Sequence, residues 1–339
     1  MFMLAKRLGI DLGTATTLIY VYGKGIVLNE PSVVAVSKNT NEILAIGREA
    51  WEMIGKTPEY IVAHRPLRDG VISDYEITRR MLTYFIQQVC GKSLFKPDVV
   101  ICIPSGGTGV EKRAVLDAAY RAGVRKAYLI EEPMAAALGA GIDITGPSGS
   151  MVIDIGGGTT DVAVLSLGGI VVSQTVRVAG DQIDEAIARH LRKKFNLLIG
   201  EKTAETIKIE IGWAVPPKEE KTLRVKGRDL VSGLPREISI TSSEIYKCLS
   251  EQLSYIVEAS RSVLEKTPPE IAADIGEKGI CLTGGGSLLR GVDEMLAKAL
   301  GTPVYVAENP ISCVALGAGK VLDYLKLLRN GFIYTKREK

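Results

Sequence analysis

Two stretches of the chain share one order of apolar strand, acid, turn and apolar strand. Near the start, the apolar run Leu8–Asp11 ends in an acid, and Leu18–Tyr22 resumes the apolar pattern after a turn of glycine and threonine. Near the middle, Met151–Asp154 and Val162–Ser166 repeat this order around three consecutive glycines. Apolar runs on both sides of a short glycine turn indicate a β-hairpin. Each stretch is therefore predicted to be a hairpin with an acid at the end of its first strand.

A second pair of matching segments follows the two hairpins. Ile101–Gly107 and Ile280–Gly286 are apolar strands that end in glycine, and each precedes a predicted helix, over Val110–Arg121 and Ser287–Leu300. The second half carries a longer insertion between its hairpin and its glycine-rich strand end. This order predicts a duplicated α/β unit, in which each copy is a mixed sheet covered by helices.

The inserted segments predict a small subdomain in each half. The first covers about residues 30–65, and the second covers about 180–241 and includes an amphipathic helix over Asp181–Phe195. Two homologous halves with facing hairpins would form a cleft between them. The predicted boundaries are 1–145 for domain I, 146–319 for domain II, and about 320–339 for a C-terminal helix that returns to domain I.

Composition narrows the class of protein. The chain has 339 residues, of which 46% are hydrophobic and 24% charged, which favours a soluble globular protein with more than one core. The net charge of +3 and the lack of a long basic run predict no nucleic-acid partner. Five cysteines without metal-binding spacing indicate reduced thiols and a cytoplasmic location. No apolar run reaches the roughly 18 residues that span a bilayer, and the N-terminal segment is too short for a signal peptide.

The glycines at 156–158 are the first indication of chemistry. They lie in a hairpin turn, whereas the Walker P-loop and the dinucleotide fingerprint both open a helix. Consecutive glycines expose backbone N–H groups to an anion. The acid beside them, Asp154, would repel a bare phosphate unless a divalent cation lay between the two. The stretch is therefore interpreted as a hairpin that binds phosphate and magnesium.

The order of these motifs resembles the actin-like ATPases, a class that includes actin, heat-shock chaperone ATPases and sugar kinases. Within that class the chain is similar to the MreB family of bacterial actin homologues over nearly its whole length. The resemblance implies an α/β actin-like fold of two duplicated domains, each with a small subdomain, around a nucleotide cleft. The matching segments are GIDLGTATTLIY, NEPSVVAV, RPLRDGVISDY, LIEEPMAAALGAG, VIDIGGGTTDVAVLSLGGIV, RVAGDQIDEAI, TAETIKIEIG, LEKTPPEIAADI and LTGGGSLLRG.

The resemblance also implies a site for ATP and Mg²⁺. Asp11 and Asp154 would hold Mg²⁺ through its waters. Glu132 would orient the attacking water, helped by Thr159; taken alone, Glu132 is an acid favoured by a helix N-terminus. The residues implied to bind the nucleotide are Gly13, Thr14, Ala15 and Thr16 in the first phosphate loop, Gly156, Gly157 and Gly158 in the second, Glu205, Thr206, Ile207 and Lys208 on a helix near the adenosine, and Gly284, Gly285, Gly286 and Ser287 in a turn that opens a helix.

Three positions depart from the family pattern. Thr16 stands where the family usually has Asn, and Asp161 stands where it usually has Glu. Both substitutions keep a polar side chain. Trp213 stands where a small residue is usual, close to the predicted adenosine helix, and either a change in nucleotide affinity or a protein contact would account for it.

As a function, the resemblance implies a filament-forming cytoskeletal ATPase. ATP would close the cleft and favour head-to-tail addition, because a heterologous contact that does not close generates filaments. The implied assembly is an antiparallel double protofilament, peripheral on the inner face of the cell membrane. Through the cell-wall elongation machinery it would direct wall synthesis and so determine cell shape. Membrane contact would come from Leu94 and Phe95, aided by Met1–Leu4.

Two other functions remain open from the sequence. A chaperone-type ATPase would need a peptide-binding domain, and the chain has no room for one after the helix expected over Ser312–Leu328. A sugar or acetate kinase would need a second substrate pocket with a catalytic base, for which the sequence offers no candidate.

Overall fold

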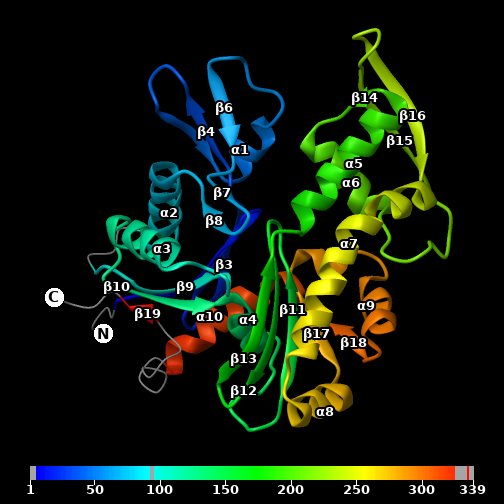
Figure 1. Cartoon of the computed structure of the whole chain (residues 1–339). Coiled ribbons are helices and arrows are strands. Elements are labelled where there is room, and N and C mark those ends of the chain that lie inside the picture. Colours follow the sequence, from blue (N-terminus) through cyan, green and yellow to red (C-terminus); the bar gives the residue numbers. More distant parts are fainter. Residues whose placement is uncertain (1–4, 92–94, 325–333, 336–339) are drawn as a thin grey trace.

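The computed structural model describes residues 5–91, 95–324 and 334–335. Two mixed β-sheets form its centre, one in each half of the molecule (Figure 1). The first has the order β19-β10-β9-β1-β2-β3, with bounds Tyr334–Thr335, Lys126–Glu131, Asp98–Ile103, Arg7–Leu12, Thr16–Val21 and Gly25–Pro31. The second has the order β13-β12-β11-β17-β18, with bounds Gly169–Val176, Thr160–Ser166, Ser150–Ile155, Ile280–Thr283 and Val304–Val306.

The duplication predicted from the sequence is visible in the pairing of the strands. β1 is antiparallel to β2 and parallel to β9, and β11 is antiparallel to β12 and parallel to β17. β10 and β18 extend the two sheets in the same parallel sense. Each half is thus a three-stranded antiparallel unit followed by parallel strands, which confirms the predicted fold class.

Each sheet carries a small subdomain at its upper end in Figure 1. In the first half the subdomain is a three-stranded sheet with one short helix: β4 (Val34–Ser37), β5 (Ile43–Ile46), β6 (Ile61–His64) and α1 (Arg48–Met53). In the second half it contains three strands and two helices: β14 (Leu197–Leu198), β15 (Thr222–Asp229), β16 (Pro235–Thr241), α5 (Gly180–Phe195) and α6 (Glu201–Ile211).

The outer faces of the sheets are covered by helices with apolar stripes. On the first sheet, Phe85 and Leu82 of α2 (Tyr75–Cys90) and Leu116 of α3 (Gly109–Arg121) pack into one core with the strands. A capping box formed by Thr108 and Glu111 fixes the start of α3. The second sheet is covered by α7 (Ser242–Glu265), α8 (Pro269–Lys278) and α9 (Val292–Leu300). The strand pair β7 (Leu67–Arg68) and β8 (Val71–Ile72) lies between β6 and α2 in the chain.

Two helices at matching positions of the halves, α4 (Glu132–Gly139) and α10 (Cys313–Tyr324), pack against each other at the centre (Figure 1). A Cβ built on Gly139 would lie 1.8 Å from the carbonyl oxygen of Cys313, and one built on Gly317 would lie 1.8 Å from that of Ala135. Only glycine permits this approach. The backbones of the two helices are therefore in direct contact at both glycines. One apolar core spans both halves at this point.

Two predicted helices differ from the structure. The helix expected over Ser287–Leu300 begins at Val292, because Gly284–Leu289 forms a single 3₁₀ turn, η1 (Gly285–Leu288), and Gly291 adopts a φ of 73°. The C-terminal helix expected at about 320–339 is helical only to Tyr324 within the described residues. Tyr334–Thr335 is a strand that pairs with β10, so this segment returns to the first sheet as an edge strand.

Candidate functional site

A cleft of about 540 Å³ lies between the two halves, where the two hairpin turns face each other. Its lining comes from both sheets, both small subdomains and α4. It brings together most of the predicted site residues, from positions that are far apart in the sequence. These are Asp11, Gly13, Thr14, Ala15, Thr16, Glu132, Asp154, Gly156, Gly157, Gly158, Thr159, Glu205, Lys208, Gly284, Gly285 and Gly286.

The two hairpin turns approach each other closely across the cleft. A Cβ built on Gly157 would lie 2.6 Å from the Cβ of Ala15, and one built on Gly158 would lie 2.7 Å from the Thr14 hydroxyl and 3.0 Å from the backbone of Asp69. Neither glycine has a positive φ. These glycines are therefore required for the contact between the halves, in addition to exposing backbone N–H groups.

Hydrogen bonds from neighbouring segments hold the carbonyl groups of both turns. Ser32 is fully buried, and it donates its hydroxyl to Gly13 O (2.7 Å) and its N–H to Ala15 O (3.0 Å). The first residues of α5, at 180–181, donate N–H groups to Gly156 O (3.2 Å) and Gly157 O (2.8 Å). The peptide planes of both turns are thereby fixed by segments outside the two hairpins.

Three carboxyl groups on the floor of the cleft repel one another. Burial and the nearby Asp154 raise the pKa of Asp11 to about 8. Burial also raises the pKa of Asp154 to about 7, although the Thr283 hydroxyl, 2.6 Å away, acts to lower it. Burial and the charges of Asp161, Asp11 and Asp154 raise the pKa of Glu132 well above its usual range. Such a cluster cannot be fully ionised without a cation nearby.

The carboxyl groups of the cleft are not arranged as direct metal ligands. Within the described part of the chain, no three or more His, Cys, Asp or Glu side chains are arranged to hold a metal ion directly. Mg²⁺ commonly keeps several of its waters and takes further ligands from phosphate oxygens. Asp11 and Asp154, buried beside the phosphate-loop glycines, fit an ion bound in that manner.

Two of the four residues predicted to face the adenosine line the cleft. Glu205 and Lys208 line the cleft, whereas Ile207 is buried in the core and Thr206 donates its hydroxyl to Lys202 O at 2.8 Å. Lys208 Nζ lies 2.7 Å from Asp184 Oδ2, a partner that the sequence did not suggest.

Ser287 is another predicted residue that does not line the cleft. It is buried and donates its hydroxyl to Gly284 O at 2.6 Å, which stabilises the 3₁₀ turn. Trp213 does not line the cleft either, and it forms an isolated backbone bridge with Arg290.

Exposed apolar side chains line the cleft beside the glycine-rich turn. Ile209 of α6, Leu288 of η1 and Ile311 of the short helix η2 (Pro310–Ser312) are 60%, 57% and 43% exposed. Apolar side chains that line a pocket beside placed polar groups are typical of a site for a small organic molecule. Nothing in the sequence distinguishes these three residues from the apolar core residues beside them, such as Ile207 and Leu289.

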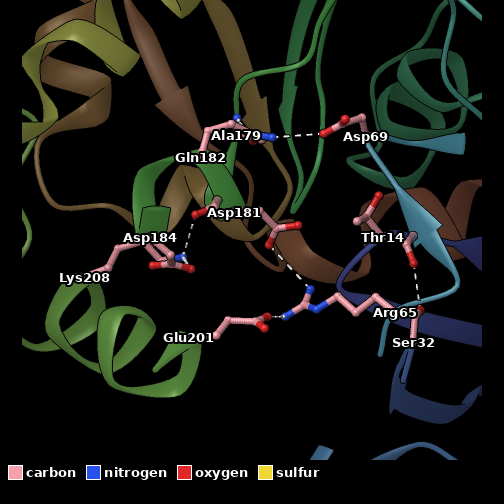
Figure 2. Close-up of polar contacts among 12 residues, drawn as sticks. Thr14, Ser32, Arg65, Asp69, Ala179, Asp181, Gln182, Asp184, Glu201 and Lys208 are labelled. Carbon is pink, nitrogen blue, oxygen red and sulfur yellow. Dashed lines mark hydrogen bonds and ion pairs between the residues drawn. The ribbon is translucent and has the colours of Figure 1, made fainter. Parts of the chain in front are cut away.

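Polar bridges cross the cleft between the two halves (Figure 2). Arg65, which follows β6, lies 3.4 Å from Asp181 at the start of α5 and 2.6 Å from Glu201 at the start of α6. Gln182 donates a hydrogen bond to Asp69 at 3.0 Å. Arg65 and Asp181 lie in segments that match the family, RPLRDGVISDY and RVAGDQIDEAI, but no local pattern predicts a bridge between them. The halves are thus bonded at the mouth of the cleft as well as at its floor.

The residues predicted to contact a membrane fall largely outside the described part of the chain. Leu94 and Met1–Leu4 lie outside it, and Phe95 is described and 53% exposed. Among the described residues, no helix has the length and apolar character needed to cross a bilayer.

The duplicated sheets, the shared central helices and the cleft between two glycine hairpins define an actin-like fold. The family model described as MreB/Mbl protein matches residues 5–330, and the chain belongs to this family. Cell shape-determining protein Mbl of Bacillus cereus is 53% identical over 96% of the chain and 98% of its own length.

Two solved structures resemble the fold closely. MreB 5 of Spiroplasma citri bound to AMPPNP is 40% identical, with a TM-score of 0.91 over 95% of this chain and 97% of that one. MamK in a double helical filament is 25% identical, with a TM-score of 0.81 over 94% and 99% of the two chains.

Proposed function

We propose that the protein is an ATP-binding and ATP-hydrolysing bacterial actin-like protein that polymerises into filaments. The observation that carries this proposal is the contact between the two hairpin turns, one from each copy of the duplicated unit, over a floor of buried acids. A phosphate tail bound there would touch both halves at once. Relatives are named as cell shape-determining, AMPPNP-bound and filamentous proteins, which supports nucleotide binding and filament formation.

The proposed roles of individual residues combine the family resemblance with the positions of these residues in the cleft. The backbone N–H groups of the turns at 13–16 and 156–158 would hold the phosphates. Asp11 and Asp154 would hold Mg²⁺ through water, which would neutralise the phosphate oxygens and the acids together. Glu132 would orient the attacking water beside Thr159. Glu205 and Lys208 would contact the ribose, with the base against Ile209, Leu288 and Ile311.

Because nucleotide would bind both halves, it would set the angle between them. The closed form would then add head to tail into antiparallel double protofilaments on the inner face of the membrane, anchored through Leu94 and Phe95 and through Met1–Leu4. There the filaments would organise cell-wall elongation and so determine cell shape. Domain I (1–145) and domain II (146–319) are the two moving bodies of this proposal.

Sedimentation tests the proposed function. The purified protein is incubated with ATP and Mg²⁺, with and without liposomes, then pelleted and imaged by electron microscopy. Nucleotide-dependent filaments are expected, and binding to liposomes should be lost when Leu94 and Phe95 are both changed to serine. Absence of filaments under all conditions, together with phosphoryl transfer to a sugar, would contradict the proposal and favour a kinase.

One added methyl group at Gly158 is expected to separate the two hairpin turns and so to weaken ATP binding. In Gly158→Ala, the new Cβ would lie 2.7 Å from the Thr14 hydroxyl of the other turn and 3.0 Å from the Asp69 backbone, and it would push the two turns apart. Overpacking costs about 1–3 kcal/mol, so ATP affinity should fall roughly tenfold or more. Gly109→Ala is the matched control, because nothing lies within 4 Å of a Cβ there. Equal ATP affinity of both variants in a fluorescent-nucleotide titration would refute the role of the contact.

The bridge at Arg65 is expected to slow nucleotide release. Arg65→Ala removes the ion pairs to Asp181 and Glu201. Both acids are partly exposed, so each pair contributes at most about 1 kcal/mol, and release of ADP should accelerate roughly two- to fivefold. Arg125→Ala removes a bidentate pair with Asp98 inside the first half and serves as control. Stopped-flow release rates that are the same for both variants would exclude a role for the bridge.

A further inference from the structure

Positive charge gathers where the parallel strands of the first sheet begin. Arg7 of β1 and Lys126 of β10 both pair with Asp98 of β9, so the three strands start side by side. The Tyr22 N–H donates to Arg7 O at 3.0 Å, which brings the β2–β3 turn to the same edge. Among the described residues of these strand ends and of this turn, Asp98 is the single acid, and Arg125 donates to it at 2.8 Å. The cationic residues at this edge are Lys6, Arg7, Lys24, Lys96, Arg125 and Lys126. The edge is therefore strongly positive, although the whole chain carries a net charge of only +3.

A cavity of about 210 Å³ opens at this edge, between the β2–β3 turn and the last turn of α2. Its lining combines two ammonium groups and one amide with apolar side chains, and none of these lining residues is an acid. The lining residues are Lys6, Val21, Lys24, Val27, Leu28, Gln88 and Val89. Such a lining suits a ligand in which an anionic group is joined to an apolar body.

The two lysines of the cavity differ in the partners they already have. Lys6 Nζ donates to Val89 O at 2.9 Å and to Cys90 O at 3.1 Å, at the C-terminal end of α2. An ammonium group has three donors, so one donor of Lys6 remains. Lys24 is exposed in its turn, and the described part of the chain offers its side chain no hydrogen bond or ion pair. The cavity therefore keeps positive charge and donors for a ligand.

The cavity also lies where both proposed membrane anchors leave the fold. Lys6 comes shortly after Met1–Leu4 in the chain. Its bonds to the last turn of α2 join it to the segment that leads into Leu94 and Phe95. The two proposed anchors thus start beside the same cavity.

Exposed apolar side chains accompany the positive charge. Tyr22, Val27 and Phe95 are 43%, 45% and 53% exposed. The Arg7 guanidinium lies 3.4 Å from the centre of the Tyr22 ring. Exposed aromatic and aliphatic side chains among cations are typical of a surface that meets the headgroup layer of a bilayer.

We propose that this cavity binds the phosphate of an anionic phospholipid, with Lys6 and Lys24 as the donors. The inference deepens the membrane contact of the proposed function and rests on it. A soluble phosphate ester would satisfy the two lysines alone, whereas a lipid in a bilayer would also cover Tyr22 and Val27 and is reached together with both anchors. The cavity would therefore add selectivity for anionic headgroups to anchors that are shallow by themselves.

Vesicle flotation tests this site. The protein is mixed with ATP, Mg²⁺ and vesicles of phosphatidylcholine, with or without phosphatidylglycerol, and floated through a density gradient, because filaments sink and vesicle-bound protein rises. Binding is expected to be stronger with phosphatidylglycerol and to weaken as salt is added. Lys24→Gln should lower the affinity for anionic vesicles about fivefold, the effect of one lysine at such a surface. Lys6→Gln should lower it at least as far.

Two other lysines provide matched controls. Lys126 lies at the same edge but does not line the cavity, and Lys38 is exposed in the β4–β5 turn of the small subdomain. Lys126→Gln should lower the affinity by a clearly smaller factor than Lys24→Gln, and Lys38→Gln should leave it unchanged. Equal losses in Lys24→Gln and Lys126→Gln would indicate a diffuse attraction to the whole edge and would overturn the site.

The remaining outcomes distinguish lipid from soluble phosphate, and this inference from the proposed function. Calorimetric titration with glycerol phosphate, without vesicles, should show no binding that depends on Lys24; such binding would overturn the lipid as occupant. Filaments that form with ATP, together with vesicle binding that is insensitive to phosphatidylglycerol and to Lys24→Gln, would overturn the inference and leave polymerisation in place. Vesicle binding that depends on Lys24, without filaments under any condition, would refute polymerisation and support the site.

Discussion

Replacing Glu132 by alanine is expected to leave a protein that binds ATP but releases phosphate at least about 100-fold more slowly, the usual scale for loss of a group that handles a reacting proton. Glu132 is the first residue of α4, lines the cleft and is surrounded by other carboxyls. Removing one acid from this cluster relieves repulsion, so affinity for ATP with Mg²⁺ should hold or rise. Phosphate release and fluorescent-ATP binding, measured on the same preparation, separate the two effects.

The adjacent acid provides the control for this variant. Glu131 precedes α4 without a side-chain capping bond, lies 3.4 Å from Lys112, and does not line the cleft. Glu131→Gln should therefore keep phosphate release close to that of the unaltered protein. Unchanged turnover in Glu132→Ala would remove Glu132 from its proposed role, whatever the control shows.

A single methyl group at the crossing of α4 and α10 is expected to destabilise the whole fold. In Gly139→Ala and Gly317→Ala the new Cβ would lie 1.8 Å from a backbone carbonyl of the other helix. Backbone cannot move aside as a side chain can, so each change should lower the free energy of unfolding by about 3 kcal/mol or more, the upper end for overpacked cores. Urea unfolding followed by circular dichroism measures this loss.

A third helical glycine tests whether the crossing is the cause. Gly276 lies within α8, and nothing lies within 4 Å of a Cβ built on it. Gly276→Ala should stabilise the protein by about 0.5–1 kcal/mol through helix propensity alone. Stabilities of Gly139→Ala and Gly317→Ala close to that of the unaltered protein would mean that the helices can separate without cost.

The duplication could be predicted because its signals are local. An acid, a glycine turn and flanking apolar runs lie within a few residues of one another at each hairpin, as at Asp154 and Gly156–Gly158, and the structure has both hairpins. The fold class followed from their repetition in one order. The predicted start of α9 is wrong because the glycine-rich segment at 284–291 forms a 3₁₀ turn and an extended residue before the helix.

Contacts between distant segments could not be predicted in the same way. Arg65 and Asp181 are separated by 116 residues, and Ser105 and Asp161 by 56. Neither pair has a local pattern that distinguishes it from ordinary surface charges or turn residues.

Helix periodicity alone predicts that only part of the segment 205–208 faces the adenosine. Positions three apart, such as Glu205 and Lys208, share a face of a helix, but the residues between them do not. Thr206 and Ile207 belong to the predicted face only through the continuous segment TAETIKIEIG that resembles the family. In the structure Ile207 faces the core and leaves the cleft to its neighbours.

One phosphate tail is proposed to bridge both copies of the duplicated unit. A crystal structure of the protein with AMPPNP and Mg²⁺ tests this directly. We expect phosphate oxygens within hydrogen-bond distance of backbone N–H groups in both turns, at 13–16 and at 156–158, with Mg²⁺ waters between the phosphates and Asp11 and Asp154. Phosphates bound to one turn alone, or nucleotide bound outside the cleft, would contradict it.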